Sequence, residues 1–258
     1  MWQRTAGVAI LLMLSLAVAT AQNVQKVTFP SRDGLQITAD VLKAASATAP
    51  WLVLCHQARW SRGEYRETMP WFADLGYNCI AVDLRSGGEV NGVVNETHQR
   101  AVEKGLGTTY VDAQQDMEAA IEYVRKQFKA RQVILVGSSY SAALALVVAA
   151  LHPEQVDGVI AFSPGEYFVR LGKSENFIAQ HLAAVQCPVL ITCAAQERHF
   201  CEHFQQAVRS GQKVRFFVPP NDGAHGSRAL WKQFPQSQKY RTVVREFLEH
   251  FFPVGSTK

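Results

Sequence analysis

The sequence predicts an α/β protein whose sheet is mostly parallel and carries helices on both faces. Short apolar runs rich in Val, Ile and Leu recur along the chain without the polar alternation of a half-exposed strand. Amphipathic or apolar helical patterns separate these runs. An antiparallel hairpin comes before the alternating strands and helices, which is the order of an α/β sheet with helices on both sides.

The strands follow from these runs. The first two, 24–29 and 35–43, are joined by Asp33-Gly34, a strong hairpin signal. The later runs are short enough to be strands buried on both faces of the sheet. They comprise 51–56, 79–84, 133–137, 156–162, 188–193 and 213–218.

Four helices are expected between and after these strands. The first, 66–76, has Pro70 in its first turn and ends at Gly76. The second, 109–128, begins at a capping-box-like pair, Thr109 and Asp112. The third, 141–151, is apolar on nearly every side and should be interior, and 241–252 closes the chain.

Composition favours an ordinary globular protein. The chain has 258 residues, 48% hydrophobic and 19% charged, with a formal net charge of +4. These values exclude disordered, collagen-like and polytopic membrane classes. No basic run or basic–aromatic stripe is present, so nucleic acid is not an expected partner.

The N-terminal residues 1–21 have the pattern of a secretory signal peptide. Arg4 precedes an apolar run over 6–19, which is closed by Ala19-Thr20-Ala21. The run is shorter than the roughly 20 residues of a bilayer span, so a membrane anchor is the weaker alternative. We therefore expect cleavage before Gln22 and a single domain over 22–258. The mature protein should be secreted or periplasmic, without stable membrane association.

Five cysteines remain in the exported chain, so at least one thiol is expected to be free. If a disulfide forms, Cys201 should pair with Cys187 or Cys193. Sequence does not choose between the two.

One motif predicts most of the chemistry. Gly137-Ser138-Ser139-Tyr140-Ser141-Ala142 stands between a predicted strand and the interior helix. A sharp strand-to-helix turn needs small residues around its apex, and it strains the apex residue so that its side chain projects. Ser139 occupies that apex, and Ser141 replaces the second Gly of the usual G-x-S-x-G pattern. The competing interpretation is a serine that merely caps a helix.

Partners for Ser139 lie in two later loops. A serine nucleophile needs an imidazole base and a carboxylate that orients it. His225 lies in a Gly-flanked loop after the last predicted strand and is the expected base. Glu197 follows the preceding strand and is the favoured acid, with Glu166 as the alternative. Asp222 is expected to shape the turn before His225.

An oxyanion hole should complete the site. One donor is expected to be the backbone N–H of Tyr140, the residue after the nucleophile. The second should come from the loop after the 51–56 strand, with Ala58 favoured and Gln57 next. His56 in the same loop is expected to be structural.

Together these residues resemble the α/β-hydrolase superfamily, and especially its compact dienelactone-hydrolase-like branch. The resemblance covers nearly all of 22–258, including His56-Gln57-Ala58, Gly76-Tyr77 and the 83–87 segment. It implies an eight-stranded sheet with an antiparallel second strand, and ester hydrolysis without a cofactor. Dienelactone hydrolases carry cysteine at the elbow where this chain has Ser139, so their substrate is not implied. Gln57 also stands where glycine is more frequent.

Other features are weaker. His199 and His203 are one helical turn apart, but no third ligand is evident, so no metal is expected. Asn95-Glu96-Thr97 fits a glycan acceptor or a polar loop. Segment 86–108 has no obvious element and could wall the substrate pocket. The stretch 164–186 holds little more than one helix, so no large lid domain is expected.

The sequence therefore predicts an exported serine hydrolase acting on small, soluble esters or similar acyl compounds. Two alternatives remain: a peptidase acting on short peptides, and a binding protein that keeps the scaffold without activity. The sequence leaves the oligomeric state open.

Overall fold

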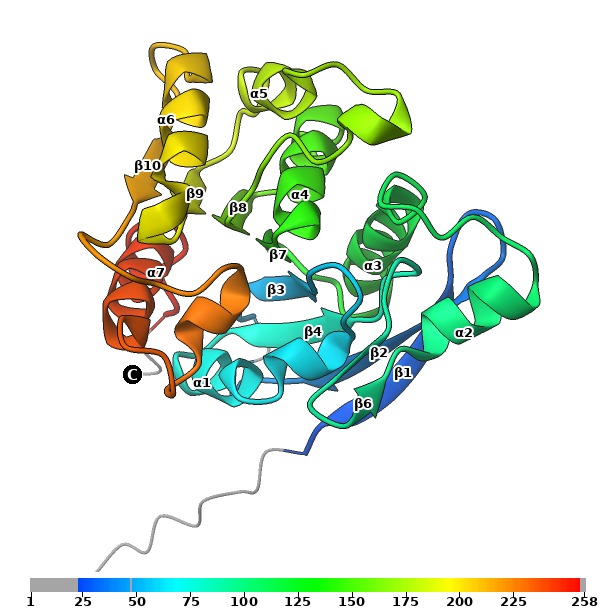
Figure 1. Ribbon diagram of the computed structural model, residues 1–258. Coiled ribbons are helices and arrows are strands. Elements are labelled where there is room, and N and C mark those ends of the chain that lie inside the picture. The colour runs from blue at the N-terminus through cyan, green and yellow to red at the C-terminus, as the bar shows by residue number, and fades with distance from the viewer. Residues whose placement is uncertain (1–22, 47, 256–258) are drawn as a thin grey trace, which may run out of the picture.

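The computed structural model describes residues 23–46 and 48–255, and within them one eight-stranded sheet forms the centre of the molecule (Figure 1). Its strand order is β1-β2-β4-β3-β7-β8-β9-β10. The pairs β1–β2 and β2–β4 are antiparallel, and every other neighbouring pair is parallel. The predicted mostly parallel sheet is thereby confirmed. The predicted signal peptide, residues 1–21, lies outside the described residues.

All eight predicted strands are present, with ends that differ by a few residues from the predicted ones. Their bounds are β1 Gln25–Pro30, β2 Gln36–Leu42, β3 Trp51–Cys55, β4 Asn78–Val82, β7 Val133–Ser138, β8 Gly158–Phe162, β9 Val189–Thr192 and β10 Val214–Phe217. At the predicted hairpin, Gly34 has a φ of 79°, and Asp33 Oδ1 accepts from the Leu35 N–H at 3.2 Å.

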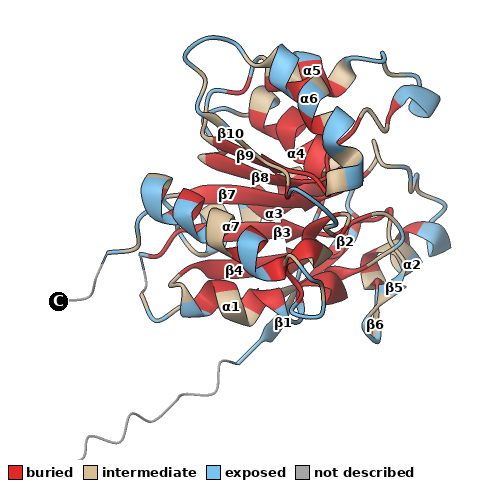
Figure 2. Cartoon of the chain, turned by 60° about the vertical axis from the view of Figure 1, so that its left-hand side comes forward, coloured by how far each residue is buried: buried red, intermediate tan, exposed pale blue. Residues whose placement is uncertain are grey.

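Helices cover both faces of the sheet. One face carries α3 (Gln114–Gln127), α4 (Tyr140–Leu151), α5 (Phe177–Leu182) and α6 (Arg198–Ala207), and the other carries α1 (Thr68–Asp74) and α7 (Ser237–Phe251). Alternate residues of β3 explain this: Val53 packs into the first core and Leu52 into the second. The central strands are buried along their whole length (Figure 2).

The interior helix is confirmed at α4, where residues 140–149 are all buried. Helix α3 begins at Gln114, later than predicted. Thr109 and Asp112 do exchange backbone-to-side-chain hydrogen bonds, at 2.8 and 3.3 Å, but they close a separate turn before the helix.

Segment 86–108 is not structureless, contrary to the expectation from sequence. It forms a small hairpin, β5 (Glu89–Val90) with β6 (Val93–Val94), followed by α2 (Glu96–Glu103). Asn91 and Gly92 join the two strands with φ of 53° and 70°. This Asn-Gly pair is a hairpin signal that the sequence analysis passed over.

Asn95 caps α2 and is not a glycan acceptor in the folded protein. Its side chain is 1% exposed and accepts from the His98 N–H at 2.8 Å. Its amide donates to the Leu84 carbonyl at 2.9 Å. A glycan on this nitrogen would have no room.

Four 3-10 turns complete the described part of the chain: η1 Arg62–Tyr65, η2 Val169–Leu171, η3 Ala195–Glu197 and η4 Ser227–Leu230. Among the described residues, no helix combines the length and apolar character that crossing a membrane requires.

Candidate active site

The turn between β7 and α4, residues 137–142, is the sharp elbow that the sequence predicts. Ser139 has φ 58° and ψ −119°, a region that residues other than glycine rarely adopt. A Cβ on Gly137 would lie 2.4 Å from the Ser141 carbonyl oxygen, so strand and helix touch at this point. Ser139 N–H donates to the Phe162 carbonyl at 2.8 Å, which ties the apex to β8.

Ser141, which stands where the usual motif has glycine, is buried and fully bonded. Its Oγ accepts from the Ser138 N–H at 2.8 Å and donates to the Cys55 carbonyl at 2.7 Å. The hydroxyl therefore links the elbow to the end of β3, and this is why a polar residue is tolerated there.

His225 and Glu197 form the contact expected of a base and its orienting acid. His225 Nδ1 is hydrogen-bonded to Glu197 Oε1. The other carboxylate oxygen accepts from Ser163 Oγ at 2.7 Å and from the Ala194 N–H at 3.1 Å. Burial alone would raise the pKa of Glu197, but the hydrogen bonds from His225 and Ser163 hold it below its ordinary value. The carboxylate is thus kept ionised beside the imidazole.

Glu166, the alternative acid, is engaged elsewhere. Its carboxylate accepts from the backbone N–H groups of Ile178 and Ala179 at 2.8 and 2.9 Å, at the N-terminus of α5. His203 Nε2 lies 3.4 Å from the same carboxylate. The structure therefore brings Glu197, and not Glu166, to His225.

The loop that carries His225, residues 218–230 (the histidine loop), is tied directly to the elbow. Ser227 N–H donates to Ser138 Oγ at 2.8 Å, and Gly226 N–H donates to Ser163 Oγ at 3.0 Å. Gly226 has φ 73°, and a Cβ there would lie 2.4 Å from Ser138 Oγ, so only glycine fits. The first bond joins the histidine loop to the residue before Ser139, and the second joins it to the residue that follows β8.

Ser139 and His225 are not hydrogen-bonded to each other in the described part of the chain. The hydroxyl of Tyr167 lies close to that of Ser139 and donates to the Ser163 carbonyl at 2.9 Å. Burial raises the pKa of Tyr167 to about 12, against the opposing effect of Ser139. Sequence analysis missed Tyr167, because an aromatic residue in a loop carries no signal of this contact.

Two of the expected oxyanion donors are free to bind an acceptor as far as the described residues show. Within the described residues, no hydrogen bond uses the backbone N–H of Tyr140 or that of Ala58. Tyr140 begins α4, where helix geometry leaves such groups without a partner.

Gln57 does not offer the backbone donor that the sequence analysis named as the alternative. Its N–H donates to Glu64 Oε2 at 2.7 Å. Its side-chain Nε2, in contrast, is buried and has no hydrogen-bond partner among residues 23–46 and 48–255. Glu64 is a second residue that the sequence analysis missed; a glutamate inside a polar, turn-like stretch reads as an exposed side chain.

His56 has the structural role expected of it. The ring is fully buried, with Nδ1 2.8 Å from the Gln57 carbonyl, and Nε2 accepts from the Leu84 N–H at 2.9 Å. Burial lowers its pKa to about 4, so the ring is neutral near neutral pH and braces the loop after β3.

A disulfide joins Cys193 to Cys201, which resolves the two predicted pairings in favour of Cys193. The bond ties the end of β9 to α6 on either side of Glu197. Cys55, Cys79 and Cys187 are free thiols. Across residues 23–46 and 48–255, no group of three or more His, Cys, Asp or Glu side chains is placed to hold a metal ion.

Comparison with known proteins finds relatives among hydrolases. Residues 47–184 match the family model described as serine aminopeptidase, S33. The match includes the elbow and the loop after β3. A carboxymethylenebutenolidase from Pseudomonas putida is 27% identical over 198 residues, which are 72% of this chain and 76% of that protein.

Solved structures of similar fold are also hydrolases. A dienelactone hydrolase from Anabaena variabilis superposes with a TM-score of 0.69 at 14% identity, covering 89% of this chain and 98% of that one. An esterase from Pyrococcus furiosus has a TM-score of 0.67 at 15% identity, covering 89% and 91%. A Pyrococcus horikoshii acylaminoacyl peptidase, with a TM-score of 0.69 at 18% identity, covers 93% of this chain but 43% of its own.

Proposed function

The chain belongs to the serine aminopeptidase S33 family of α/β-hydrolases and is a hydrolase, and on this basis we propose that it is an exported serine hydrolase of small carboxylic esters. Ser139 attacks the acyl carbonyl, and His225 accepts the hydroxyl proton through Nε2. Glu197 holds the imidazole through Nδ1 and stabilises the imidazolium that forms. His225 then passes the proton to the leaving alcohol, and water releases the acyl group from Ser139 by the same route.

The oxyanion of each tetrahedral intermediate would bind between the backbone N–H groups of Tyr140 and Ala58. Both donors lack a partner in the described chain, and Tyr140 lies at the start of a buried helix whose dipole favours negative charge. In this proposal Tyr167 holds the resting Ser139 hydroxyl, which turns to His225 when substrate is bound.

One observation carries the proposal: a strained Ser139 is linked to the His225–Glu197 pair through direct hydrogen bonds between their loops. Ser138 binds the Ser227 N–H, and Ser163 binds both Glu197 and the Gly226 N–H. Four loops far apart in sequence, which follow β7, β8, β9 and β10, meet at one end of the sheet with their polar groups paired. A serine that only capped a helix would not need this arrangement.

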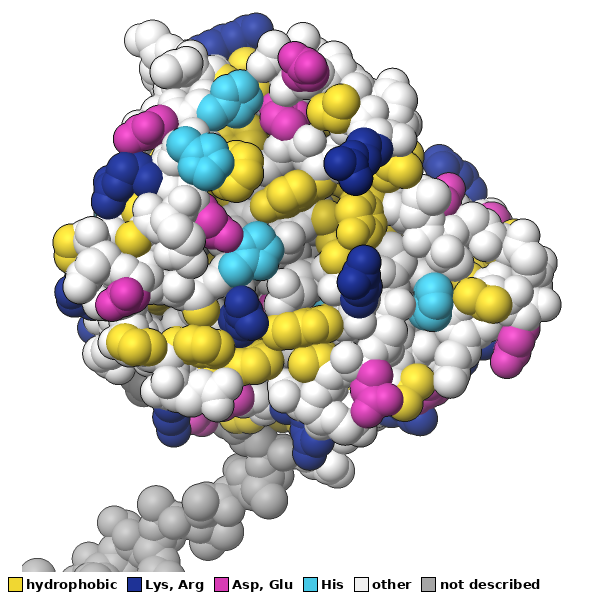
Figure 3. Space-filling view, in the orientation of Figure 1, with side chains coloured by type: hydrophobic (Ala, Val, Ile, Leu, Met, Phe, Trp, Pro, Cys, Tyr) yellow, Lys and Arg dark blue, Asp and Glu magenta, His cyan; other side chains and the backbone are white. Residues whose placement is uncertain are grey.

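Small, soluble substrates are favoured by the surroundings of Ser139. Between β8 and β9 the chain forms only η2 and α5, with no lid large enough to enclose a long acyl chain. Hydrophobic side chains gather around a histidine and basic side chains near the middle of the face seen in Figure 3. Because no large lid forms between β8 and β9, the proposed site suits short acyl groups.

The experiment is hydrolysis of nitrophenyl esters of increasing chain length by the mature protein. We expect turnover to be fastest with short acyl chains and to be lost in Ser139→Ala and His225→Ala. Glu197→Gln should reduce kcat strongly, whereas its matched control Glu166→Gln should keep most activity. His199→Ala, an exposed histidine, is the control for His225→Ala. Faster turnover of long-chain emulsions than of short esters would contradict the substrate class.

A peptidase is the second candidate, favoured by the family description and by the acylaminoacyl peptidase of similar fold. Amino-acid nitroanilides tested beside the esters separate the two. A kcat/KM for a nitroanilide above that for the matching ester would replace the ester proposal with the peptidase.

Export is proposed from the signal-peptide pattern of residues 1–21 and supported by the Cys193–Cys201 disulfide, since such bonds persist in oxidising compartments. N-terminal sequencing of protein recovered after expression with the full chain tests it. The expected first residue is Gln22. Recovery of intact Met1 in the cell interior would contradict export.

A further inference from the structure

A fully buried glutamate behind the elbow has no part in the mechanism above. Glu64 lies on η1, is 0% exposed and accepts three hydrogen bonds. Its Oε2 accepts from the Gln57 N–H at 2.7 Å. Its Oε1 accepts from Ser138 Oγ at 2.7 Å and from Ser227 Oγ at 2.6 Å. Each donor belongs to a different loop.

Those three loops are the ones that carry the proposed site. Gln57 precedes Ala58, the proposed oxyanion donor; Ser138 precedes Ser139; and Ser227 is two residues after His225. Ser138 Oγ also accepts the Ser227 N–H, so the carboxylate and the two serines form one closed cluster. A small movement of Glu64 would shift all three loops relative to one another.

The donors show which form of Glu64 the cluster fits. Three N–H or O–H groups point at its two oxygens, which suits an ionised carboxylate, because a protonated one would add an O–H that needs an acceptor of its own. Burial raises the pKa of Glu64, while the three hydrogen bonds and the nearby His225 oppose that rise. A buried carboxylate is costly to desolvate, so its presence here needs these partners.

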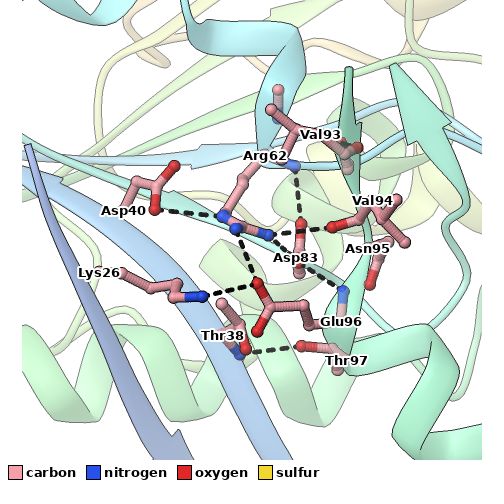
Figure 4. A network of polar contacts seen from close by, with 12 residues as sticks. Lys26, Thr38, Asp40, Arg62, Asp83, Val93, Val94, Asn95, Glu96 and Thr97 are labelled. Carbon is pink, nitrogen blue, oxygen red and sulfur yellow. Dashed lines mark hydrogen bonds and ion pairs between the residues drawn. The ribbon is translucent and has the colours of Figure 1, made fainter. Parts of the chain in front are cut away.

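The turn that carries Glu64 is itself anchored to the sheet. Arg62, two residues earlier, pairs with Asp83 at 2.6 Å, Asp40 at 3.1 Å and Glu96 at 3.0 Å (Figure 4). These partners come from the end of β4, from β2 and from α2. Trp231 Nε1 also donates to the Glu64 carbonyl at 3.0 Å. The backbone that carries the Glu64 carboxylate is therefore held in place.

We propose that Glu64 is a positioning residue for the reaction. Its carboxylate fixes the positions of the oxyanion loop (56–60), the elbow and the histidine loop relative to one another. It takes the Gln57 N–H and leaves the next one, that of Ala58, for the oxyanion. It does not touch Ser139 and is not a catalytic residue. The inference rests on the proposed function, because it presumes that Ser139 reacts.

Replacement by glutamine tests this most sharply. The amide keeps the size of the side chain, but its NH2 group cannot accept. Facing the Gln57 N–H, it leaves that donor unpaired; facing the two serine hydroxyls, it forces both to turn and accept where they now donate. We expect Glu64→Gln to lower kcat about 10- to 100-fold, because small misplacements of oxyanion donors cost that much. KM for a short nitrophenyl ester should change by less than about threefold, since ground-state binding does not use the oxyanion geometry.

The matched control is Glu67→Gln on the same stretch of chain. Glu67 is exposed and accepts from the Lys232 N–H and from the buried Arg241, and among the described residues no hydrogen bond joins it to the three loops. It should leave kcat and KM as in the wild type. The rate of fluorophosphonate labelling at Ser139 should fall in Glu64→Gln by the same factor as kcat, and stay unchanged in Glu67→Gln.

A second variant keeps the proposal testable if Glu64→Gln does not fold. Ser227→Ala removes one donor from the histidine loop and should lower kcat about 3- to 10-fold, with little change in KM. Where both variants fold, the Ser227→Ala effect should disappear in the Glu64→Gln background, because the two act through one contact. If the double variant lowers kcat by the product of the two single-variant factors, the inference is overturned.

The remaining outcomes separate this inference from the proposed function. If the wild type is active and Glu64→Gln matches it in kcat, or loses activity only through KM, the positioning role is wrong and the serine hydrolase stands. If the folded wild type neither labels nor hydrolyses esters, both the proposed function and this inference fail.

Discussion

Ser163 provides a measurable link between the acid and the rest of the proposed site. Its Oγ donates to Glu197 Oε2 at 2.7 Å and accepts the Gly226 N–H at 3.0 Å. Ser163→Ala removes both bonds. The backbone should keep its shape, because alanine must adopt the same strained φ of 53° that serine has here. The variant should lose stability and activity together.

The size of the stability loss follows from the two bonds. A hydrogen bond to a charged group contributes about 1.5–3 kcal/mol, and an unpaired buried N–H costs about 1–3 kcal/mol. With partial compensation by water in the space left by the hydroxyl, we expect the free energy of unfolding near neutral pH to fall by about 2–4 kcal/mol. kcat/KM for a short ester should fall about 10-fold, because Glu197 orients His225 less firmly.

The loss should depend on pH in a defined direction. The pKa of Glu197 is held below its ordinary value in the folded protein, so its ionised form stabilises the fold above the unfolded pKa of about 4.3. That stabilisation is lost as the pH falls through the folded pKa. Without Ser163 the pKa is lowered less, so the stability difference between wild type and Ser163→Ala should shrink in acid.

Urea unfolding near neutral pH and at about pH 3, well below the ordinary pKa of a glutamate, measures this difference. Ser210→Ala, at an exposed turn, is the control and should match the wild type at both pH values. A loss in Ser163→Ala that is equal at both pH values would refute the reasoning, because it would mean that the hydroxyl does not act through ionised Glu197.

Three further variants test contacts around the site. Ser141→Gly restores the usual elbow motif, yet should lower the free energy of unfolding by about 1–3 kcal/mol, since the Ser138 N–H loses its partner; unchanged urea unfolding would contradict this. Gln57→Met replaces a buried amide whose nitrogen has no partner in the described chain, so the free energy of unfolding should stay equal or rise by up to about 1 kcal/mol. A clear drop in the melting temperature would show that the amide is bonded. Asn95→Ala removes the cap of α2 and the amide bond to Leu84, and should cost about 2–4 kcal/mol by urea unfolding; a smaller change than at an exposed asparagine would show that the cap carries little.

Much of the fold could be predicted because the buried strands are short, apolar and separated by clear helical patterns. The eight strands, the hairpin at Asp33-Gly34 and the interior helix after Ser139 all follow from such local signals. In segment 86–108 the Asn91-Gly92 hairpin does have a sequence signal, whereas α2 does not, because it is polar and short and depends on Asn95 as a cap and on ion pairs such as Glu96 with Arg62. Packing of that kind leaves no periodic pattern in the sequence.

The candidate site likewise has a part that the sequence predicts and a part that it does not. Ser139, His225 and Glu197 stand at strand ends, where topology alone brings residues together. The exclusion of the Gln57 backbone as a donor, and the contacts of Tyr167 and Glu64, depend on side chains that reach across from other loops. No spacing in the sequence shows which loop glutamate is buried and which is exposed. Tertiary contacts decide this.

The central claim is that Ser139 is the nucleophile, and the location of a covalent adduct tests it most directly. The mature protein is treated with a fluorophosphonate, and the adduct is located by mass spectrometry of the intact protein and of its peptides. The account predicts one adduct per chain, on the peptide that contains Ser139, with none in Ser139→Ala and much slower formation in His225→Ala. A folded wild type without an adduct, or an adduct on another residue that persists in Ser139→Ala, would contradict it.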